Sequence, residues 1–156
     1  MARIIVEIRL IEPTDRAEWL RMREALWPSE SAGRGDEHDR EITAFFADAD
    51  PALATFVAVR PDGSLGGFLE AGTRPYADGC NSSPVGYIEG WYVDPDLRRT
   101  GVGGVLVHAA EGWASSLGLT EMASDAEVEN GVSLEAHAAL GYEEVGRVIQ
   151  FRKGLG

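Results

Sequence analysis

Cysteine, basic side chains and long apolar runs are all scarce in this sequence. Cys80 is the only cysteine among 156 residues, so no disulfide can form within the chain, which fits a reducing cytoplasm. One cysteine and three scattered histidines do not predict a zinc site. No apolar run is long enough to cross a bilayer, and residues 1–10 carry charges without a cleavage-site pattern. We therefore expect neither a signal peptide nor a membrane anchor.

The shortage of positive charge restricts the partners. The chain has 14 Lys and Arg against 26 Asp and Glu, a net charge of −12. This balance disfavours nucleic acid and favours cationic partners, although it also suits an ordinary soluble acidic surface. A hydrophobic content of 44% supports a real core, and the length predicts a single domain over residues 1–156.

Apolar periodicity predicts alternating strands and helices. The expected strands are residues 3–10, 54–60, 65–73, 87–93 and 121–124, with one or two more within 142–152. The expected helices are residues 15–27, 37–49, a run after Gly104 to Leu117, and 131–140. This order predicts a fold of the α/β (α+β) kind, with a mixed central sheet flanked by helices.

Short local signals set the predicted boundaries. Asp15 with Glu18 has the spacing of a capping box, and Pro28 ends the helix that follows. Residues 29–36 and 74–84 are polar and contain glycine, so both are expected to be loops, and loops as long as the second are often functional. Gly141 suits the position after a helix.

A glycine-rich turn lies between the strand 87–93 and the helix ending at Leu117. Asp94 and Pro95 end the strand, and Arg98 to Gly104 follow with glycines at 101, 103 and 104. Glycine allows close approach of a ligand to the backbone, and the free amides and dipole of a helix N-terminus favour an anion. The turn is therefore a candidate pyrophosphate cradle, although an ordinary glycine-rich connection is the simpler alternative.

The spacing of this turn excludes two common phosphate motifs. No lysine follows the glycines, as a P-loop requires, and Leu106 stands where a dinucleotide fingerprint needs glycine. The pattern Arg/Gln-x-x-Gly-x-Gly/Ala is met by Arg98, Gly101 and Gly103. It resembles the acetyl-CoA motif of the GNAT family of N-acetyltransferases.

Further segments resemble one branch of that family, the aminoglycoside 6′-N-acetyltransferases. They are Leu26-Trp27-Pro28, residues 78–85 (DGCNSSPV), Glu89-Gly90, residues 121–125 (EMASD) and Arg147-Val148-Ile149. Enzymes of this branch transfer acetyl from acetyl-CoA to an amino group of antibiotics such as kanamycin or tobramycin. The resemblance covers essentially the whole chain and implies a complete GNAT fold, acetyl-CoA as co-substrate and no metal.

The resemblance also implies site residues. The cofactor would be held by the backbone of one strand, by the turn and by one asparagine: Trp91, Tyr92, Val93, Arg98, Arg99, Thr100, Gly101, Val102, Gly103, Gly104 and Asn130. The aminoglycoside would be bound by aromatic and acidic side chains: Trp27, Tyr76, Glu89 and Asp125. Trp27 also fits core packing, Asn130 a helix cap and Asp125 a turn, so these roles depend on the resemblance.

The chemistry of a polycationic substrate agrees with this set. Carboxylates suit ammonium groups and aromatic faces suit sugar rings. Glu89 lies in the strand that leads to the turn, and Asp125 lies at the end of the next strand, so either is a candidate general base for the attacking amine. Glu89 also fits a salt-bridged strand residue. Backbone N–H near Tyr92 or Val93 could stabilise the oxyanion.

Two positions depart from the family pattern. Many GNAT enzymes have a tyrosine as general acid where this chain has His137, which fits either that role or a buried helix position. Relatives in this branch can carry a substrate-binding acid where this chain has Gly146. A GNAT enzyme for another cationic amine, such as a polyamine or a protein N-terminus, and a non-catalytic acyl-CoA-binding module remain alternatives. The resemblance also implies a homodimer.

Overall fold

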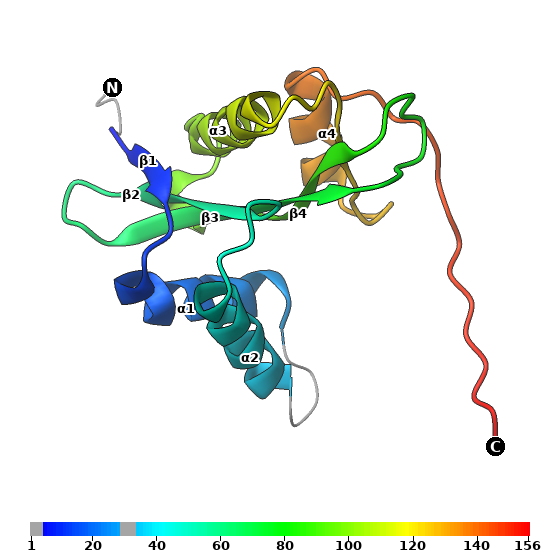
Figure 1. The fold of residues 1–156 in the computed structure, drawn as a ribbon. Helices are drawn as coiled ribbons and strands as arrows, with labels where there is room; N and C mark the ends of the chain where they lie inside the picture. The colour runs from blue at the N-terminus through cyan, green and yellow to red at the C-terminus, as the bar shows by residue number, and fades with distance from the viewer. Residues whose placement is uncertain (1–4, 29–33) are drawn as a thin grey trace.

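The computed structural model describes residues 5–28 and 34–156 (Figure 1). Five strands form one sheet in the order β1-β2-β3-β4-β5. Their bounds are β1 Glu7–Leu10, β2 Ala54–Val59, β3 Leu65–Arg74, β4 Val85–Val93 and β5 Met122–Ser124. The first four strands pair antiparallel, whereas β5 runs parallel to β4. The predicted mixed sheet is confirmed.

Helices cover both faces of this sheet (Figure 1). The helices are α1 Arg16–Leu26, α2 Arg34–Ala47, α3 Val102–Ser116 and α4 Gly131–Ala139, with short 3₁₀ turns η1 Pro13–Asp15 and η2 Pro95–Leu97. Helices α1 and α2 lie on one face, and α3 and α4 lie on the other (Figure 1). Each predicted helix is therefore present, and the sheet is the central layer of three.

Strand β2 shows why helices pack on both faces of the sheet. Alternate side chains point to opposite faces of a strand, so Phe56 joins the cluster under α3 whereas Val57 joins the cluster under α1 and α2. On α3, the apolar side chains Leu106, Val107 and Ala110 recur at helical spacing and are fully buried. Burial on both faces places β2 and β3 between the two helix layers.

Two predicted boundaries on the N-terminal side are corrected. Asp15 and Glu18 do not form a capping box, because the Asp15 carboxylate accepts hydrogen bonds from the Glu12 N–H at 2.8 Å and from Arg9 at 2.7 Å. The capping box that forms joins Glu12 to Asp15 across η1. Helix α2 begins at Arg34, inside the predicted loop 29–36, of which residues 29–33 lie outside the described residues.

The predicted strand or strands within 142–152 are wrong for this chain. Residues 143–156 form neither helix nor strand, and all of them are exposed. The segment leaves the body of the protein and ends far from the sheet (Figure 1). Its apolar pattern suits a strand, but a strand needs a neighbour for its N–H and C=O groups, and the chain offers this segment none.

Asp94 joins three elements at the end of β4. Its carboxylate accepts hydrogen bonds from Arg21 of α1 and from Arg60, which follows β2, each at 3.0 Å, and from the Tyr92 hydroxyl at 3.1 Å. Burial opposes ionisation of Asp94, but these hydrogen bonds outweigh it and hold its pKa below the ordinary value. The junction fixes the end of β4 immediately before the glycine-rich turn.

Candidate active site

Strands β3 and β5 both pair with β4, but the two pairings end at different residues of β4. The pairing with β3 continues to Val93, whereas the parallel pairing with β5 ends at Ile88 opposite Ser124. The register with β3 passes from Ile88 opposite Ala71 to Gly90 opposite Glu70, so Glu89 is an extra residue in a β-bulge. In the part of the chain that the structure describes, residues 89–93 of β4 therefore have no strand on the β5 side, and an extended ligand can pair with their backbone.

The glycine-rich turn follows β4 as predicted. Gly101 has φ +92°, a conformation that favours glycine, and it is the N-cap residue of α3. The first helical hydrogen bond runs from the Val105 N–H to the Gly101 carbonyl at 3.1 Å. The N–H groups of residues 102–104 therefore have no acceptor within α3, and with the helix dipole they favour an anion.

Side chains around this turn complete a cationic rim. Arg98 donates from Nε to the Val93 carbonyl at 3.0 Å, and Arg99 is exposed in a left-handed conformation with φ +63°.

The Trp91 ring packs against Gly103 in the first turn of α3. A Cβ atom at Gly103 would lie 3.1 Å from this ring, whose Nε1 donates to the Gly103 carbonyl at 3.2 Å. A glycine here thus lets the Trp91 ring lie against the first turn of α3.

Trp27 lies on the opposite face of β4, over Gly90. A Cβ at Gly90 would be 2.5 Å from Cη2 of Trp27, so the indole rests directly on the strand backbone. His38 stacks on the indole at 6.2 Å between ring centroids and donates from Nε2 to the Trp27 carbonyl at 2.9 Å. Arg23 lies 5.2 Å from the ring centroid. Trp27 packs against the core, as the core-packing interpretation anticipates, and forms a half-buried platform over the strand.

Glu89 and Asp125 each have a partner on this same face. Glu89 accepts two hydrogen bonds from Arg74, at 2.9 and 2.7 Å, as the salt-bridge alternative anticipated. Asp125 accepts a hydrogen bond from the Tyr87 hydroxyl at 2.7 Å, and Arg74 stacks 3.5 Å over the Tyr87 ring. The structure thus links the two predicted acids through Arg74 and Tyr87, neither of which was predicted from the sequence.

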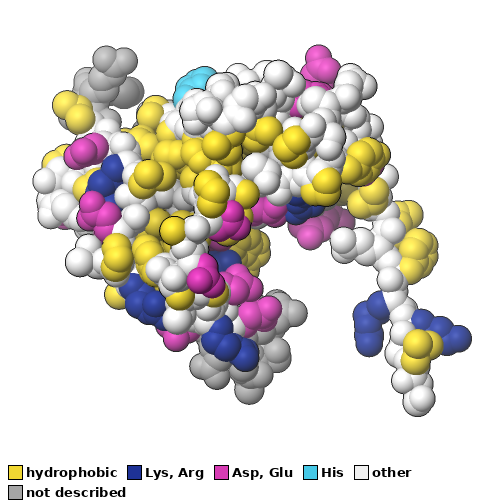
Figure 2. All heavy atoms as spheres, viewed as in Figure 1, with side chains coloured by type: hydrophobic (Ala, Val, Ile, Leu, Met, Phe, Trp, Pro, Cys, Tyr) yellow, Lys and Arg dark blue, Asp and Glu magenta, His cyan; other side chains and the backbone are white. Residues whose placement is uncertain are grey.

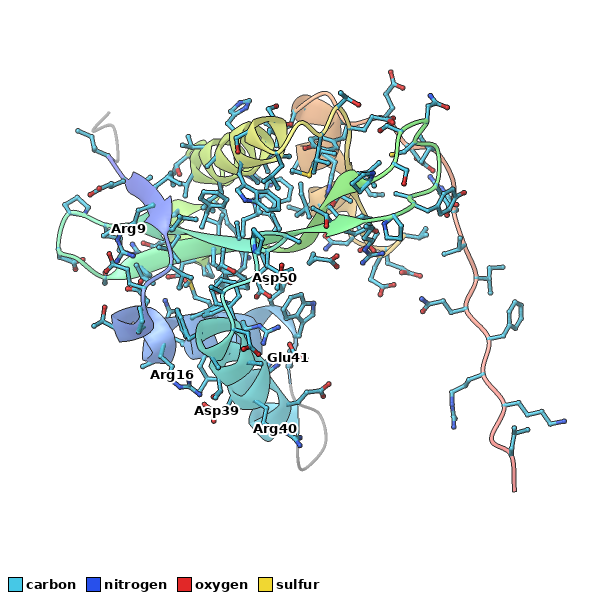
Figure 3. All side chains as sticks on the ribbon, in the orientation of Figure 1. Arg9, Arg16, Asp39, Arg40, Glu41 and Asp50 are labelled. Atoms are coloured by element: carbon cyan, nitrogen blue, oxygen red, sulfur yellow. The ribbon has the colours of Figure 1, made fainter. Side chains whose placement is uncertain are left out.

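A recess in the α1/α2 face lies beside this platform. The cavity has a volume of about 330 Å³ and is lined by Trp19, Arg23, Glu41, Ala44, Phe45, Asp48, Asp50, Leu53 and Glu70. Figure 3 shows two of its acids, Glu41 on α2 and Asp50 on the segment that leads to β2. At its base Arg23 lies 3.0 Å from the Glu70 carboxylate, and burial raises the pKa of Glu70. Acidic side chains outnumber basic ones in this recess, which favours a cation.

Two predicted site residues, and the position at which this chain lacks an acid found in relatives, have simpler surroundings. Tyr76 lies in the loop between β3 and β4, where it is 68% exposed and donates its hydroxyl hydrogen to Asp78 at 2.9 Å. Asn130 caps α4, because its side-chain oxygen accepts from the Ser133 N–H at 3.1 Å. Gly146 lies in the extended C-terminal segment, and a Cβ there would meet nothing within 4 Å. These contacts neither support nor contradict the roles assigned to Tyr76 and Asn130.

His137 of α4 lies on the face of β4 that carries α3 (Figure 1). Its ring packs edge-on against Trp91 at 5.2 Å and against Tyr142 at 5.8 Å between centroids. Nε2 lies 2.8 Å from the Ser124 hydroxyl, and Nδ1 lies 2.7 Å from the Ser133 carbonyl. Ser124 was not predicted as a site residue. The only sign in the sequence that it could belong to the site was its place in the segment 121–125, which resembles the family.

In the described residues no group of His, Cys, Asp or Glu could hold a metal ion, and no helix is long and apolar enough to span a membrane.

Comparison with known proteins agrees with this geometry. Residues 19–142 match the acetyltransferase (GNAT) family, and the chain belongs to that family. Within it, the chain is 49% identical over 150 residues to an aminoglycoside N(6′)-acetyltransferase type 1 of Klebsiella aerogenes, covering 95% of this chain and 96% of the relative. A protein of the same name from Stenotrophomonas maltophilia is 42% identical over 149 residues, with 95% and 93% covered.

Solved structures give the same result. AAC(6′)-Ih from Acinetobacter baumannii, an aminoglycoside antibiotic 6′-N-acetyltransferase, has a TM-score of 0.85 and 34% identity, covering 97% of this chain and 100% of that one. AAC(6′)-Iy in complex with the bisubstrate analog CoA-S-monomethyl-acetylneamine has a TM-score of 0.85 and 38% identity, with 97% and 99% covered. The chain therefore belongs to the aminoglycoside 6′-N-acetyltransferase branch of the GNAT family.

Proposed function

We propose that this protein transfers the acetyl group of acetyl-CoA to the 6′-amino group of aminoglycosides and so confers resistance to them. The supporting observation is the unpaired edge of β4 at residues 89–93, which separates a basic, glycine-rich turn on one face from an acidic and aromatic surface on the other. The relatives that share this arrangement are named for the same reaction, and one of them binds a molecule that joins CoA to an aminoglycoside. A cytoplasmic location fits the supply of acetyl-CoA.

The cofactor lies along the unpaired edge in this proposal. Backbone groups of Trp91, Tyr92 and Val93 pair with its pantetheine arm as an added strand would. The N–H groups at the start of α3 and the guanidinium groups of Arg98 and Arg99 hold its pyrophosphate. The side-chain amide of Asn130 donates to the cofactor beyond β5 while its oxygen caps α4.

The aminoglycoside lies on the α1/α2 face. Its sugar rings stack on Trp27 and Tyr76, and its ammonium groups pair with Glu89 and Asp125. The Arg74–Glu89 ion pair does not prevent this, because its side chains are 42% and 38% exposed and such exposed pairs contribute only about 1 kcal/mol or less. A substrate ammonium therefore displaces Arg74 at small cost.

The 6′-ammonium group gives up two protons during the reaction. The first passes to Glu89 or Asp125, directly or through water, and leaves a neutral amine, and the second leaves the nitrogen as the tetrahedral intermediate collapses. The nitrogen of the neutral amine attacks the thioester carbon, and the oxyanion that forms accepts hydrogen bonds from backbone N–H groups near Tyr92 or Val93. Collapse of the tetrahedral intermediate breaks the C–S bond and releases CoA as a thiolate. His137 lies on the cofactor side of β4, where it can supply the proton that this thiolate needs.

The release of CoA thiol from acetyl-CoA with a panel of aminoglycosides tests the reaction. Turnover on 6′-amino compounds, with none on a compound that carries a 6′-hydroxyl, is the expected result. Turnover on both would preserve the acetyltransferase but remove the 6′ assignment. Binding of acetyl-CoA without turnover on any aminoglycoside would favour another amine substrate.

A substitution separates the roles of Glu89. If Glu89 is the base, Glu89→Gln lowers kcat by roughly 10²- to 10⁴-fold; if it only binds substrate, KM rises with little change in kcat. Glu129→Gln is the matched control, because Glu129 is also an exposed acid and is not among the residues assigned to the substrate or the cofactor. Unchanged kcat and KM in Glu89→Gln would remove Glu89 from the site.

A homodimer completes the proposal. Hydrophobic side chains lie along the exposed C-terminal segment (Figure 2). Val148, Ile149 and Phe151 of this segment are 72%, 80% and 89% exposed, and among the described residues β5 has a strand neighbour on one side only. An apolar segment without a strand partner and an open sheet edge in the same chain suit exchange between two copies. Light scattering tests this: Ile149→Asp should reduce the dimer fraction, whereas Gln150→Asp, with the same added charge on the other side of the segment, should not. A monomeric wild-type protein would exclude the dimer.

A further inference from the structure

Ser124 occupies the point where β4 and β5 separate. It is the last residue of β5 and lies opposite Ile88, and the next residue of β4 is the bulged Glu89. Asp125, which follows Ser124, is on the substrate face, where it contacts Tyr87. Since successive side chains of a strand point to opposite faces, Ser124 is directed to the face that carries α3, α4 and the cofactor turn.

The hydrogen bonds of His137 define its tautomer. A carbonyl oxygen can only accept, so Nδ1, 2.7 Å from the Ser133 carbonyl, carries a hydrogen. In a neutral imidazole Nε2 then has a lone pair, and it accepts the Ser124 hydroxyl hydrogen at 2.8 Å. The ring is fixed between Trp91 and Tyr142, and the Tyr142 hydroxyl does not compete for Nε2, because it donates to Glu111 at 2.8 Å.

This arrangement also accommodates the protonated ring. In the imidazolium both nitrogens donate, and both have an acceptor in place: the Ser133 carbonyl for Nδ1 and the Ser124 oxygen for Nε2. The Ser124 hydroxyl is then free to turn its own hydrogen toward the separation of β4 and β5. Because the Ser124 oxygen covers Nε2, a proton that leaves this nitrogen toward the thioester passes through that oxygen.

We propose that Ser124 and His137 form a two-residue relay that protonates the departing CoA thiolate; this inference rests on the proposed acetyl transfer. As the C–S bond breaks, the hydroxyl proton of Ser124 moves to sulfur and the Nε2 proton of His137 moves to the Ser124 oxygen. The products are a CoA thiol, an intact serine hydroxyl and a neutral imidazole. The imidazole regains a proton from solvent, and solvent receives the two protons that the substrate ammonium group lost.

Single-turnover acetyl transfer with Ser124→Ala tests the relay. We expect a rate roughly 10- to 100-fold lower, at the low end of general acid catalysis, with the Kd for acetyl-CoA within about twofold of wild type. Ser124→Thr keeps a hydroxyl and should restore most of the rate. Ser116→Ala is the matched control, because its hydroxyl only donates to a carbonyl within α3, at 2.6 Å.

Two further measurements distinguish a relay from a structural role. The double variant Ser124→Ala with His137→Gln should be no slower than His137→Gln alone, because residues that act as one unit are not additive. Nitrogen-15 NMR of labelled histidine should show His137 protonated at Nδ1 in wild type and in Ser124→Ala. Any of four results would overturn the relay. The first two are a wild-type rate in Ser124→Ala and multiplicative losses of rate in the double variant. The other two are a Ser124→Thr variant as slow as Ser124→Ala, and a wild-type His137 that carries no hydrogen on Nδ1. The panel assay on the wild-type protein decides the proposed function separately.

Discussion

The contact between Gly90 and Trp27 gives the sharpest prediction, for the variant Gly90→Ala. The added methyl group would lie 2.5 Å from Cη2 and 2.9 Å from Cζ2 of Trp27, far inside van der Waals contact. The indole cannot turn away freely, because His38 stacks on it and Phe68 meets it edge-on at 6.4 Å between centroids. Either the ring leaves its platform or β4 shifts away from α1.

The expected cost follows from overpacking. Forcing a methyl group into a packed site costs about 1–3 kcal/mol in the free energy of unfolding. For a chain of this size each kcal/mol lowers Tm by roughly 2–4 °C, so Tm should fall by about 2–12 °C. Gly112→Ala is the control: Gly112 lies in α3 with nothing within 4 Å of its Cβ position, so alanine there should stabilise the helix by about 0.5–1 kcal/mol.

Urea unfolding and steady-state kinetics measure the effect. Gly90→Ala should raise KM for the aminoglycoside, because Trp27 is displaced, and should change KM for acetyl-CoA little, because the methyl group points toward α1. Adding Trp27→Leu should recover part of the lost stability, with a coupling energy of about 0.5–3 kcal/mol. Wild-type stability and wild-type aminoglycoside KM in Gly90→Ala would refute the role of Trp27 as a rigid platform.

Three further predictions concern other junctions. Asp94→Asn should lower the free energy of unfolding, measured in urea at pH 7, by about 1–3 kcal/mol. Because the folded pKa of Asp94 lies below the unfolded value of 3.8, the difference between wild type and variant should shrink as pH falls through the folded pKa. A difference that stays constant with pH would contradict the pairing of Asp94. Arg23→Met should cost up to about 3–5 kcal/mol, because it leaves the largely buried Glu70 carboxylate with the Trp19 N–H but without its cation. Glu70→Leu in the same chain should recover much of this loss, and an additive loss would refute the ion pair. Gly103→Ala should raise the Kd of acetyl-CoA roughly tenfold in a fluorescence titration by pushing on the Trp91 ring, and an unchanged Kd would contradict that contact.

Local chemistry explains what the sequence predicted well. Pro95 ends a strand, Gly101 suits a left-handed N-cap and apolar periodicity marks α3, because each depends on residues close together in the chain. The order of the elements and the position of the glycine-rich turn were therefore predictable. The predicted capping box was wrong by one short turn, because Arg9 and the Glu12 N–H donate hydrogen bonds to the Asp15 carboxylate. Sequence spacing does not show which donors reach that carboxylate.

The site required the tertiary structure. The Arg74–Glu89 and Tyr87–Asp125 contacts join residues 15 and 38 positions apart, and the bulge that sets Glu89 apart from β3 depends on pairing register. Apolar alternation near the C-terminus predicted a strand that the chain does not form, because a strand exists only with a neighbour to accept its hydrogen bonds. Within the described residues, the sequence by itself determined the four helices, the five strands of the sheet and the glycine-rich turn before α3, since those depend on local propensity. Only the tertiary structure decided which acid meets which cation and where β4 is left unpaired, since those depend on how distant segments pack.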